Sequence, residues 1–354
     1  MAKKWRCAVV GTGMAGEWHV RLVPQLPNAE LIALCDIVPA KAQAALDKNK
    51  LPAIPIYSDM AEMLKKEQID VVHVAIPSGA HMDTIIMAME AGKNVISEKP
   101  LEIQLDRIDR MVETAQRCGV KLAGIFQNRW NPANRALKQA AIEGRYGRIA
   151  WAGCFTPWYR ADKYYEDGGW RGTWKLDGGG AIMNQSVHAI DLLQWIVGPV
   201  KQVSAYASSR IHAKIEVEDT LSCSLQFENG AFGTIMGTTA MYPGGPVRIE
   251  VGGENGTACT EWSLKTWKFR EERPEDKDMI ERINGKQGAS TGGGSSAADV
   301  PADFHALNIH HILSSWEAGK EADTCGSEAR KAVAIILAMY ESAKNNGKPV
   351  AVKQ

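Results

Sequence analysis

A glycine-rich turn near the N-terminus constrains the fold of this chain more than any other sequence feature. The apolar run Cys7–Val10 leads into Gly11-Thr-Gly13-Met-Ala-Gly16, and a segment of helical character follows. In such a motif the first glycine makes a tight turn, the second lets the backbone approach a pyrophosphate, and the third allows close helix–strand packing. The helix N-terminus then faces the phosphates. The pattern predicts a Rossmann dinucleotide-binding domain.

An acidic residue after the second predicted strand favours one cofactor over the other. The strand-like run Ala29–Cys35 is followed by Asp36, about twenty residues beyond Gly16. A carboxylate at this position binds the hydroxyls of the adenosine ribose and repels the 2′-phosphate of NADP. The sequence therefore predicts NAD as the cofactor.

Strand-like and helical runs alternate up to about residue 128, which predicts a parallel sheet with helices on both faces. Ligands of such sheets bind beyond the carboxyl ends of the strands. These ends carry Pro77-Ser-Gly-Ala-His81, Glu98-Lys99-Pro100 and Gln127-Asn128-Arg129. Polar groups thus gather where the nicotinamide ring is expected. The predicted NAD contacts are Gly11, Gly13, Met14, Gly16, Asp36, Ala75, Pro77, Ser78, His81, Glu98, Lys99 and Gln127.

Beyond about residue 148 the pattern changes to consecutive strand-like runs joined by turns such as Glu228-Asn-Gly230. This arrangement predicts an open, largely antiparallel sheet, with a helix over residues 178–195 on one face. Because no further helix remains in that region for the other face, we expect this sheet to form a homodimer or homotetramer. The predicted fold class is α/β, with an NAD-binding Rossmann domain over 1–128. An α+β domain for substrate binding and oligomerisation is predicted over 129–354.

Composition excludes several classes of partner. The chain has 41 Lys plus Arg and 41 Asp plus Glu, with no basic tract, so neither nucleic acid nor a membrane surface is an expected partner. The seven cysteines lack metal-ligand spacing, so no metal site is expected. Reduced cysteines, and the lack of a secretory signal or long apolar run, predict a cytoplasmic protein.

The Gly/Ser-rich stretch 284–298 is expected to form a protease-sensitive loop.

A second glycine motif precedes a helix with polar side chains. Gly178-Gly-Gly180 leads into a helical run that carries Asn184, His188 and Asp191. Spacings of four and three residues place these side chains on neighbouring faces of one helix. A structural helix with a hydrogen-bonded histidine would have the same pattern, and the upstream nucleotide fingerprint favours a catalytic histidine.

Three motifs together resemble the Gfo/Idh/MocA family of sugar and cyclitol oxidoreductases: the glycine fingerprint, Glu98-Lys99-Pro100, and the Gly-Gly-Gly-x(3)-Asn-x(3)-His segment. The resemblance spans essentially the whole chain. It implies a Rossmann domain followed by an open sheet that mediates oligomers, with Lys99 and His188 as the catalytic pair. Many members carry an aspartate where this chain has Asn184. The asparagine version resembles the branch that oxidises hexuronic or nucleotide-linked sugars, including C3 dehydrogenases of UDP-N-acetylglucosaminuronate.

Oxidation of a secondary alcohol requires a base within about 2.6–3.2 Å of the hydroxyl. Lys99 can act as this base if burial and the cationic nicotinamide lower its pKa, whereas a histidine such as His188 has a reference pKa of about 6.5. Asn184 cannot carry the charge that would stabilise an imidazolium, although it can accept from the imidazole or bind a substrate hydroxyl. We therefore favour Lys99 as the main proton acceptor, with His188 positioning the hydroxyl or relaying the proton.

Aromatic and arginine side chains indicate the class of substrate. Residues 151–195 contain five tryptophans and three tyrosines, whose rings suit the mixed faces of a pyranose. Arg160 and Arg171 lie among them and can hold a carboxylate or phosphate bidentately. Any one of these aromatic residues, taken alone, fits a core or interface position better. The predicted substrate contacts are Arg129, Trp158, Tyr159, Arg160, Tyr165, Trp170, Arg171 and His305.

The leading hypothesis is an NAD-dependent dehydrogenase that oxidises a ring hydroxyl, C3 by resemblance, of a sugar or sugar acid. A second hypothesis is an NAD-dependent glycosidase or lyase. In that reaction, oxidation at C3 acidifies the C2 proton, and elimination, water addition and re-reduction follow without net NADH. A third hypothesis is a non-catalytic NAD(H)-responsive binding protein, which would be expected to lack Lys99 or His188.

Overall fold

The computed structural model describes residues 4–166, 169–286 and 302–353, and the chain divides into two compact units. The Rossmann unit comprises Met1–Gln127 and Ala302–Arg330. The sheet unit comprises Asn128–Pro301 and Lys331–Gln354. The predicted protease-sensitive stretch falls almost entirely outside the described residues.

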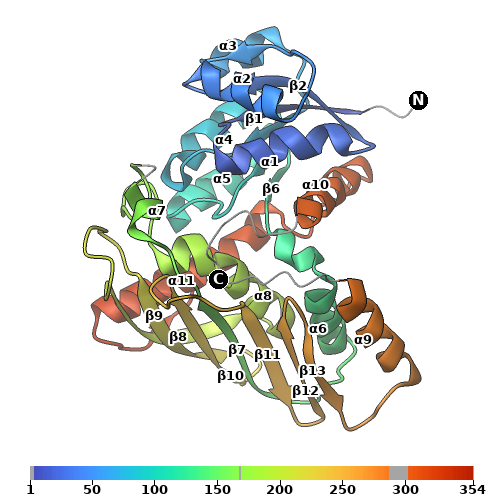
Figure 1. Cartoon of the computed structure of the whole chain (residues 1–354), viewed down its shortest axis with the longest axis vertical. Coiled ribbons are helices and arrows are strands. Elements are labelled where there is room, and N and C mark those ends of the chain that lie inside the picture. Colours follow the sequence, from blue (N-terminus) through green and yellow to red (C-terminus); the bar gives the residue numbers. More distant parts are fainter. Residues whose placement is uncertain (1–3, 167–168, 287–301, 354) are drawn as a thin grey trace. The chain divides into compact units, whose positions relative to one another are not determined.

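The Rossmann unit is built on a six-stranded parallel sheet with the order β3-β2-β1-β4-β5-β6 (Figure 1). The strand order reverses beside β1, as in a doubly wound sheet, and the predicted Rossmann fold is thereby confirmed. The strands are β1 (Trp5–Val10), β2 (Ala29–Cys35), β3 (Ile56–Tyr57), β4 (Val71–Val74), β5 (Asn94–Ser97) and β6 (Leu122–Gly124). The connecting α-helices are α1 (Met14–Leu22), α2 (Pro39–Lys48), α3 (Met60–Lys66), α4 (His81–Glu90) and α5 (Leu105–Cys118).

Helix α10 (Ala302–Glu317) returns to the Rossmann unit from far along the chain. Its buried residues Ile309, Ile312 and Leu313 share one hydrophobic cluster with residues of β1, β4 and β5. The Asn308 side chain also accepts the Phe126 N–H at 2.8 Å. The sequence-based division assigned residues 302–330 to the second domain. The structure differs because the apolar side of α10 is buried against the parallel sheet, a contact that no local pattern encodes.

The sheet unit contains an eight-stranded sheet with the order β13-β12-β11-β7-β10-β9-β8-β14. Only β7 and β10 pair in parallel, so the predicted largely antiparallel sheet is confirmed. Its strands are β7 (Ile149–Pro157), β8 (Val200–Ser208), β9 (Thr220–Phe227), β10 (Phe232–Thr238), β11 (Arg248–Gly253), β12 (Gly256–Glu261), β13 (Ser263–Phe269) and β14 (Val350–Ala351). Further elements are α6 (Pro132–Ile142), α7 (Asp162–Glu166), α8 (Val187–Val197), α9 (Pro274–Lys286) and α11 (Gly326–Lys344).

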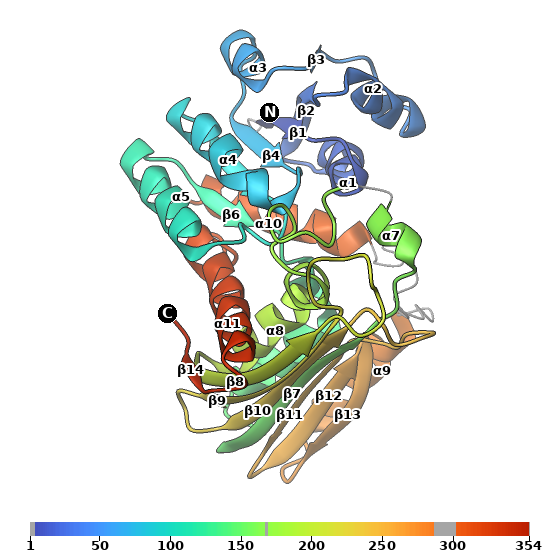
Figure 2. The ribbon, with the colours of Figure 1, turned by 90° about the vertical axis from the view of Figure 1, so that its left-hand side faces the viewer.

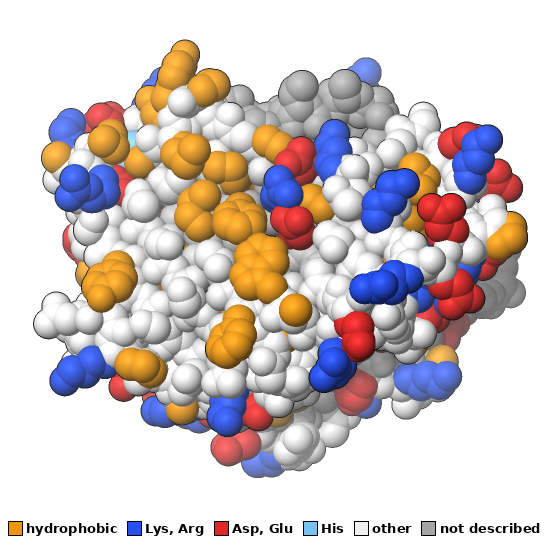
Figure 3. Space-filling model, turned by 90° about the horizontal axis from the view of Figure 1, so that it is seen from below, with side chains coloured by type: hydrophobic (Ala, Val, Ile, Leu, Met, Phe, Trp, Pro, Cys, Tyr) orange, Lys and Arg blue, Asp and Glu red, His pale blue; other side chains and the backbone are white. Residues whose placement is uncertain are grey.

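Among the described residues, helices cover one face of this sheet and none covers the other. In Figure 2, α8 and α11 lie along the same side of the strands. On the opposite face the rings of Trp151 and Phe155 lie over Gly153, where an added Cβ would come within 2.6 Å of Trp151. Phe232 and Tyr206 are 62% and 68% exposed. Figure 3 views the molecule from this side and shows hydrophobic side chains gathered on the face.

None of the helices in the described ranges combines the length and the hydrophobicity that a bilayer-spanning segment needs.

Candidate active site

The glycine turn leaves the start of α1 open for a phosphate group. Gly11 has a φ of +84°, and a Cβ there would lie 2.5 Å from the Ala75 carbonyl oxygen. A Cβ on Gly16 would lie 1.8 Å from the Gly11 carbonyl oxygen, so both positions require glycine. Gly13 precedes α1, has open space where its Cβ would be, and no side chain caps the helix at this residue. This N-terminus fits the pyrophosphate of a dinucleotide.

Asp36 directly follows β2 and is 8% exposed. One carboxylate oxygen accepts from both the N–H and the hydroxyl of Thr12 at 2.8 Å. The other oxygen accepts from the Val38 N–H at 2.9 Å. Asp36 therefore braces the glycine turn from the position where an acid is expected to bind the ribose hydroxyls.

Several of the other predicted cofactor contacts lie at strand ends or in loops of the Rossmann unit. Ala75, Pro77 and Ser78 follow β4, and Met14 at the start of α1 is 50% exposed. Gln127 is 4% exposed at the start of a short 3-10 helix, η3 (Gln127–Trp130).

The imidazole of His81 connects the loops after β4 and β5. Its nitrogens lie 2.9 Å from the Ile76 carbonyl oxygen and 3.1 Å from the Leu101 carbonyl oxygen. Burial lowers the pKa of His81, so at neutral pH the ring is neutral and donates to one of these two carbonyl oxygens. The His81 ring therefore has a structural role, because it packs between the two loops that follow β4 and β5.

Glu98, the residue before Lys99, is the acceptor in a buried cluster of imidazoles. One of its oxygens accepts from His19 at 3.0 Å and from His305 at 3.3 Å, and His19 in turn lies 2.9 Å from His73. Burial alone would raise the pKa of Glu98, but the hydrogen bonds from His19 and His305 hold it well below the usual range. An ionised carboxylate is therefore fixed beside Lys99.

His305, a predicted substrate contact, is part of this cluster. It is 3% exposed, and its ring lies edge-on to Trp18 at 4.7 Å between centroids. The other oxygen of Glu98 accepts the backbone N–H of Lys99 at 3.2 Å. His305 therefore belongs to the buried hydrogen-bond network of Glu98, whose carboxylate also binds the backbone of Lys99.

Arg129, another predicted substrate contact, is committed to an internal ion pair. It is 2% exposed and makes two hydrogen bonds, of 2.8 and 2.6 Å, to the carboxylate of Asp191 on α8. Its guanidinium also lies 5.4 Å from the centroid of Trp195. The charge of Arg129 is thereby neutralised within the sheet unit.

The segment that carries Asn184 and His188 begins with a π-helical turn, η4 (Ala181–Ser186), which continues into α8. Single π turns of this kind occur frequently at functional sites. From residue 181 to residue 194 every side chain is buried except His188, which is half-buried. The imidazole is therefore the one polar group that this stretch presents outward.

A buried aspartate that the sequence analysis did not single out holds Asn184. The Asn184 amide donates to Asp177 at 2.6 Å, and the second oxygen of Asp177 accepts the Gly172 N–H at 2.8 Å. Asp177 and Asn184 are 1% and 8% exposed. The only sequence signal was an acid directly before the three glycines.

Glu218 fixes the glycine turn that starts this helix. Its carboxylate accepts from the N–H groups of Gly180 at 3.0 Å and Ile182 at 2.9 Å. The hydroxyl of Tyr340 donates to it at 2.9 Å. Burial raises the pKa of Glu218 to about 7 despite these donors. A Cβ at Gly180 would lie 1.9 Å from the Glu218 carbonyl oxygen, so the close approach requires glycine.

Two arginines enclose an aromatic ring close to this helix. The guanidinium of Arg160 lies 5.3 Å from the centroid of Tyr164, and that of Arg171 lies 4.6 Å from it. Arg160 also donates to Gln185 of η4 at 3.1 Å and is 4% exposed. Trp158 and Trp170 provide further ring faces, at 4.9 Å from Arg160 and 5.2 Å from Arg171. Within the described ranges no carboxylate forms an ion pair with either arginine.

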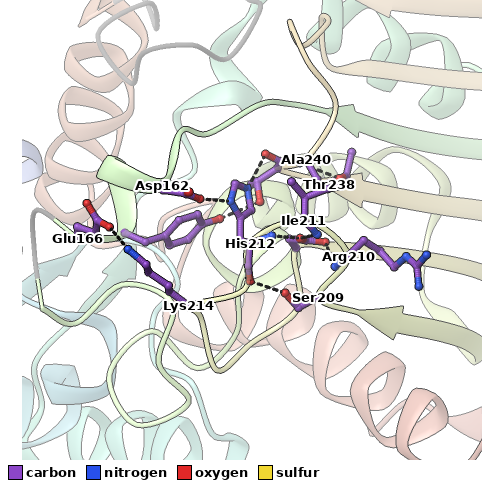
Figure 4. Close-up of polar contacts among 12 residues, drawn as sticks. Asp162, Glu166, Ser209, Arg210, Ile211, His212, Lys214, Thr238 and Ala240 are labelled. Carbon is purple, nitrogen blue, oxygen red and sulfur yellow. Dashed lines mark hydrogen bonds and ion pairs between the residues drawn. The ribbon is translucent and has the colours of Figure 1, made fainter.

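Polar contacts fix helix α7, which carries Tyr164 and Tyr165 (Figure 4). The His212 ring lies 2.9 Å from the Asp162 carboxylate and 3.2 Å from the Thr239 carbonyl oxygen. The hydroxyls of Tyr165 and Thr239 are hydrogen-bonded at 2.8 Å.

Tyr159, which precedes α7, packs edge-on against Tyr242 at 5.2 Å between ring centroids. Of the predicted aromatic substrate contacts, Tyr159 and Tyr165 are thus held by residues that follow β10.

Comparison with known proteins identifies the family. Residues 5–126 match the oxidoreductase family with an NAD-binding Rossmann fold, and residues 134–259 match the GFO/IDH/MocA C-terminal domain. The chain belongs to the Gfo/Idh/MocA oxidoreductase family. The predicted family and the predicted NAD-binding domain are thereby confirmed.

Several relatives of this chain are named as dehydrogenases. The WlbA dehydrogenase from Bordetella pertussis, solved with NADH and UDP-GlcNAcA, is 32% identical with a TM-score of 0.86, and the match covers 99% of this chain and 100% of that one. D-apiose dehydrogenase of Paraburkholderia graminis is 24% identical over 99% of this chain and 90% of its own length. D-glucoside 3-dehydrogenase of Escherichia coli is 29% identical over 64% of this chain and 67% of its own length.

Glu218 makes stability depend on pH. Its folded pKa of about 7 lies above the unfolded value of 4.5, so the folded state binds the extra proton between these values. The free energy of unfolding should therefore fall by about 3 kcal/mol as the pH rises from about 4.5 to 7. Glu218→Gln should remove this slope in urea unfolding. An unchanged slope in the variant would contradict the assignment.

Asp36 should set the preference for NAD over NADP. Asp36→Asn keeps an oxygen for Thr12 but removes the charge, so NADP affinity should rise by about tenfold or more, because like-charge contacts cost on the order of several kcal/mol. Asp36→Ala also removes the brace on the glycine turn and should weaken both cofactors. Fluorescence titration measures these affinities, and equal affinity of the unmodified protein for NAD and NADP would refute this role.

Proposed function

We propose that this protein is an NAD-dependent dehydrogenase that oxidises the C3 ring hydroxyl of an anionic, nucleotide-linked sugar acid. The observation that carries the proposal is the arginine pair that encloses Tyr164 and reaches Gln185, three residues before His188. Carbohydrate chemistry is supported by the relatives, and an acidic substrate by the arginines.

A buried guanidinium requires a partner of opposite charge or many hydrogen bonds. Other well-buried arginines of the sheet unit have such a partner: Arg129 pairs with Asp191, and Arg145 pairs with Asp276. Arg160 instead has aromatic faces and an amide oxygen, and burial lowers its pKa. A carboxylate or phosphate of the substrate would supply the missing charge through paired N–H···O bonds. UDP-GlcNAcA, which is bound in the WlbA dehydrogenase, carries both kinds of group.

The proposal assigns the proton chemistry to Lys99 and His188. Bound NAD supplies the hydride acceptor. Lys99, at the end of β5, accepts the hydroxyl proton, and the ionised Glu98 beside it stabilises the ammonium that forms. His188 positions the hydroxyl or relays the proton, and Asn184 offers an acceptor oxygen next to it. The relatives are named as dehydrogenases, so the glycosidase, lyase and non-catalytic hypotheses are not favoured.

A panel of sugars tests this function. With NAD, the protein should form NADH with UDP-N-acetylglucosaminuronate and much less with UDP-N-acetylglucosamine, which lacks the carboxylate.

Lys99→Ala should lower kcat by about 10²–10⁴-fold and leave NAD affinity nearly unchanged. Arg160→Gln should raise KM for UDP-N-acetylglucosaminuronate, whereas the exposed Arg210→Gln serves as the matched control. Release of UDP without net NADH would instead support the elimination reaction.

The proposal includes a homodimer or homotetramer in the cytoplasm. The open sheet face with Trp151, Phe155 and Phe232 is the surface proposed to meet a second copy, because a contiguous apolar face of a soluble protein marks an interaction site. All seven cysteines are free thiols, which supports a reducing compartment.

Substitution on this face tests the assembly. Phe232→Lys should shift light scattering at micromolar concentration from an oligomer toward the monomer mass, because a charge would be buried in the contact. Glu228→Lys, in the neighbouring exposed turn, is the matched control and should leave the assembly intact. A strictly monomeric unmodified protein would overturn the proposal.

A further inference from the structure

The helix with His188 lacks a carboxylate of its own at position 184, and the loop before it provides one. Asp177 lies 2.6 Å from the Asn184 amide nitrogen, and both side chains are buried. Asp177 is fixed from its other side by the Gly172 N–H at 2.8 Å. The carboxylate is therefore held in place independently of Asn184.

This contact determines which way the Asn184 amide points. An ionised carboxylate can only accept hydrogen bonds, so the nitrogen of the amide must face Asp177 and its oxygen must be turned away. Asn184 lies four residues before His188 along the helical segment, so the two side chains are neighbours. Asp177 thus controls where an acceptor oxygen lies beside His188.

We propose that Asp177 is a positioning residue of the active site, which orients Asn184 to accept a substrate hydroxyl and supplies the negative charge that position 184 lacks, since the Asp191 carboxylate on the same helix is paired with Arg129. The role in turnover rests on the proposed function. In this arrangement one carboxylate and one amide share the task that a single aspartate at position 184 would perform. When His188 holds a proton, the nearby negative charge stabilises the imidazolium.

The other charged and titratable groups that face Asp177 do not supply this charge. Tyr164 and Tyr165 from α7, and Tyr340 from α11, lie within electrostatic reach of Asp177, and Arg171 lies against Tyr164. Burial raises the pKa of all three tyrosines, so they are neutral hydroxyls near neutral pH.

Glu218, which accepts from Tyr340, does titrate near neutral pH, with a pKa of about 7. All variants are therefore compared in a Glu218→Gln background as well.

An exchange of the two side chains tests the proposal without relying on activity. The imidazole titration of His188 is followed by NMR, with its signal assigned from the His188→Gln variant. Asp177→Asn should lower the titration midpoint by roughly half a pH unit or more, because it removes the negative charge. The double variant Asp177→Asn/Asn184→Asp places the charge on the helix and should restore or raise the midpoint. An unchanged midpoint in both variants would overturn the proposal.

Kinetics with UDP-N-acetylglucosaminuronate provide the second measurement. Asp177→Asn should lower kcat by at least about tenfold, which is less than the roughly 10²–10⁴-fold contribution of a general acid–base group, because the change reorients Asn184 and leaves Lys99 and His188 in place. Asn184→Asp alone should also be slow, because two carboxylates 2.6 Å apart must share a proton. The exchange variant should recover kcat to within about threefold of the unmodified enzyme. Asp278→Asn, an exposed aspartate of the same unit that lies on α9, is the control.

A folded exchange variant that stays as slow as Asp177→Asn would contradict the positioning role. If the unmodified protein oxidises no sugar acid, the proposed function fails, and the NMR midpoints still decide whether Asp177 acts on His188.

Discussion

The helix that carries His188 starts on a buried carboxylate, and the arrangement of the sheet-unit site depends on it. The first N–H groups of a helical segment lack intrahelical acceptors, and no side chain within the segment caps Gly180. Glu218 meets this need because its carboxyl oxygens accept from the N–H groups of Gly180 and Ile182. Because Gly180 approaches the Glu218 backbone closely, the start of β9 and the start of the helix are fixed together. The position of Asn184 and His188 follows from this contact.

Buried carboxylates recur beside the proposed catalytic groups of both units. Glu98 accepts from two imidazoles and from the backbone of Lys99, and Asp177 accepts from Asn184 and from the backbone of Gly172. Each of these carboxylates accepts one hydrogen bond from a backbone N–H, and this bond helps to fix its position. Buried charges of this kind are stable only when their hydrogen bonds are complete. The proposed catalytic residues are therefore oriented by partners that do not themselves need to touch the substrate.

Much of the fold could be read from the sequence because its signals are local. Gly11, Gly16 and Asp36 define the nucleotide motif within one strand–helix–strand unit, and alternating burial in β9 follows the period of a strand. The packing partners of Arg129 and α10 could not be predicted, because they lie 62 and more than 180 residues away in the sequence. Nothing in local periodicity selects such partners. Asp177 was missed for a different reason: its role depends on the amide direction of Asn184, which only coordinates reveal.

The central claim is that hydride leaves C3 of a sugar acid for NAD. Single-turnover formation of NADH, compared between UDP-N-acetylglucosaminuronate and the same compound deuterated at C3, tests it most directly. The account predicts one NADH per substrate consumed and slower NADH formation with the C3-deuterated compound. Equal rates for the two compounds, together with slowing by deuterium at another ring carbon, would contradict it.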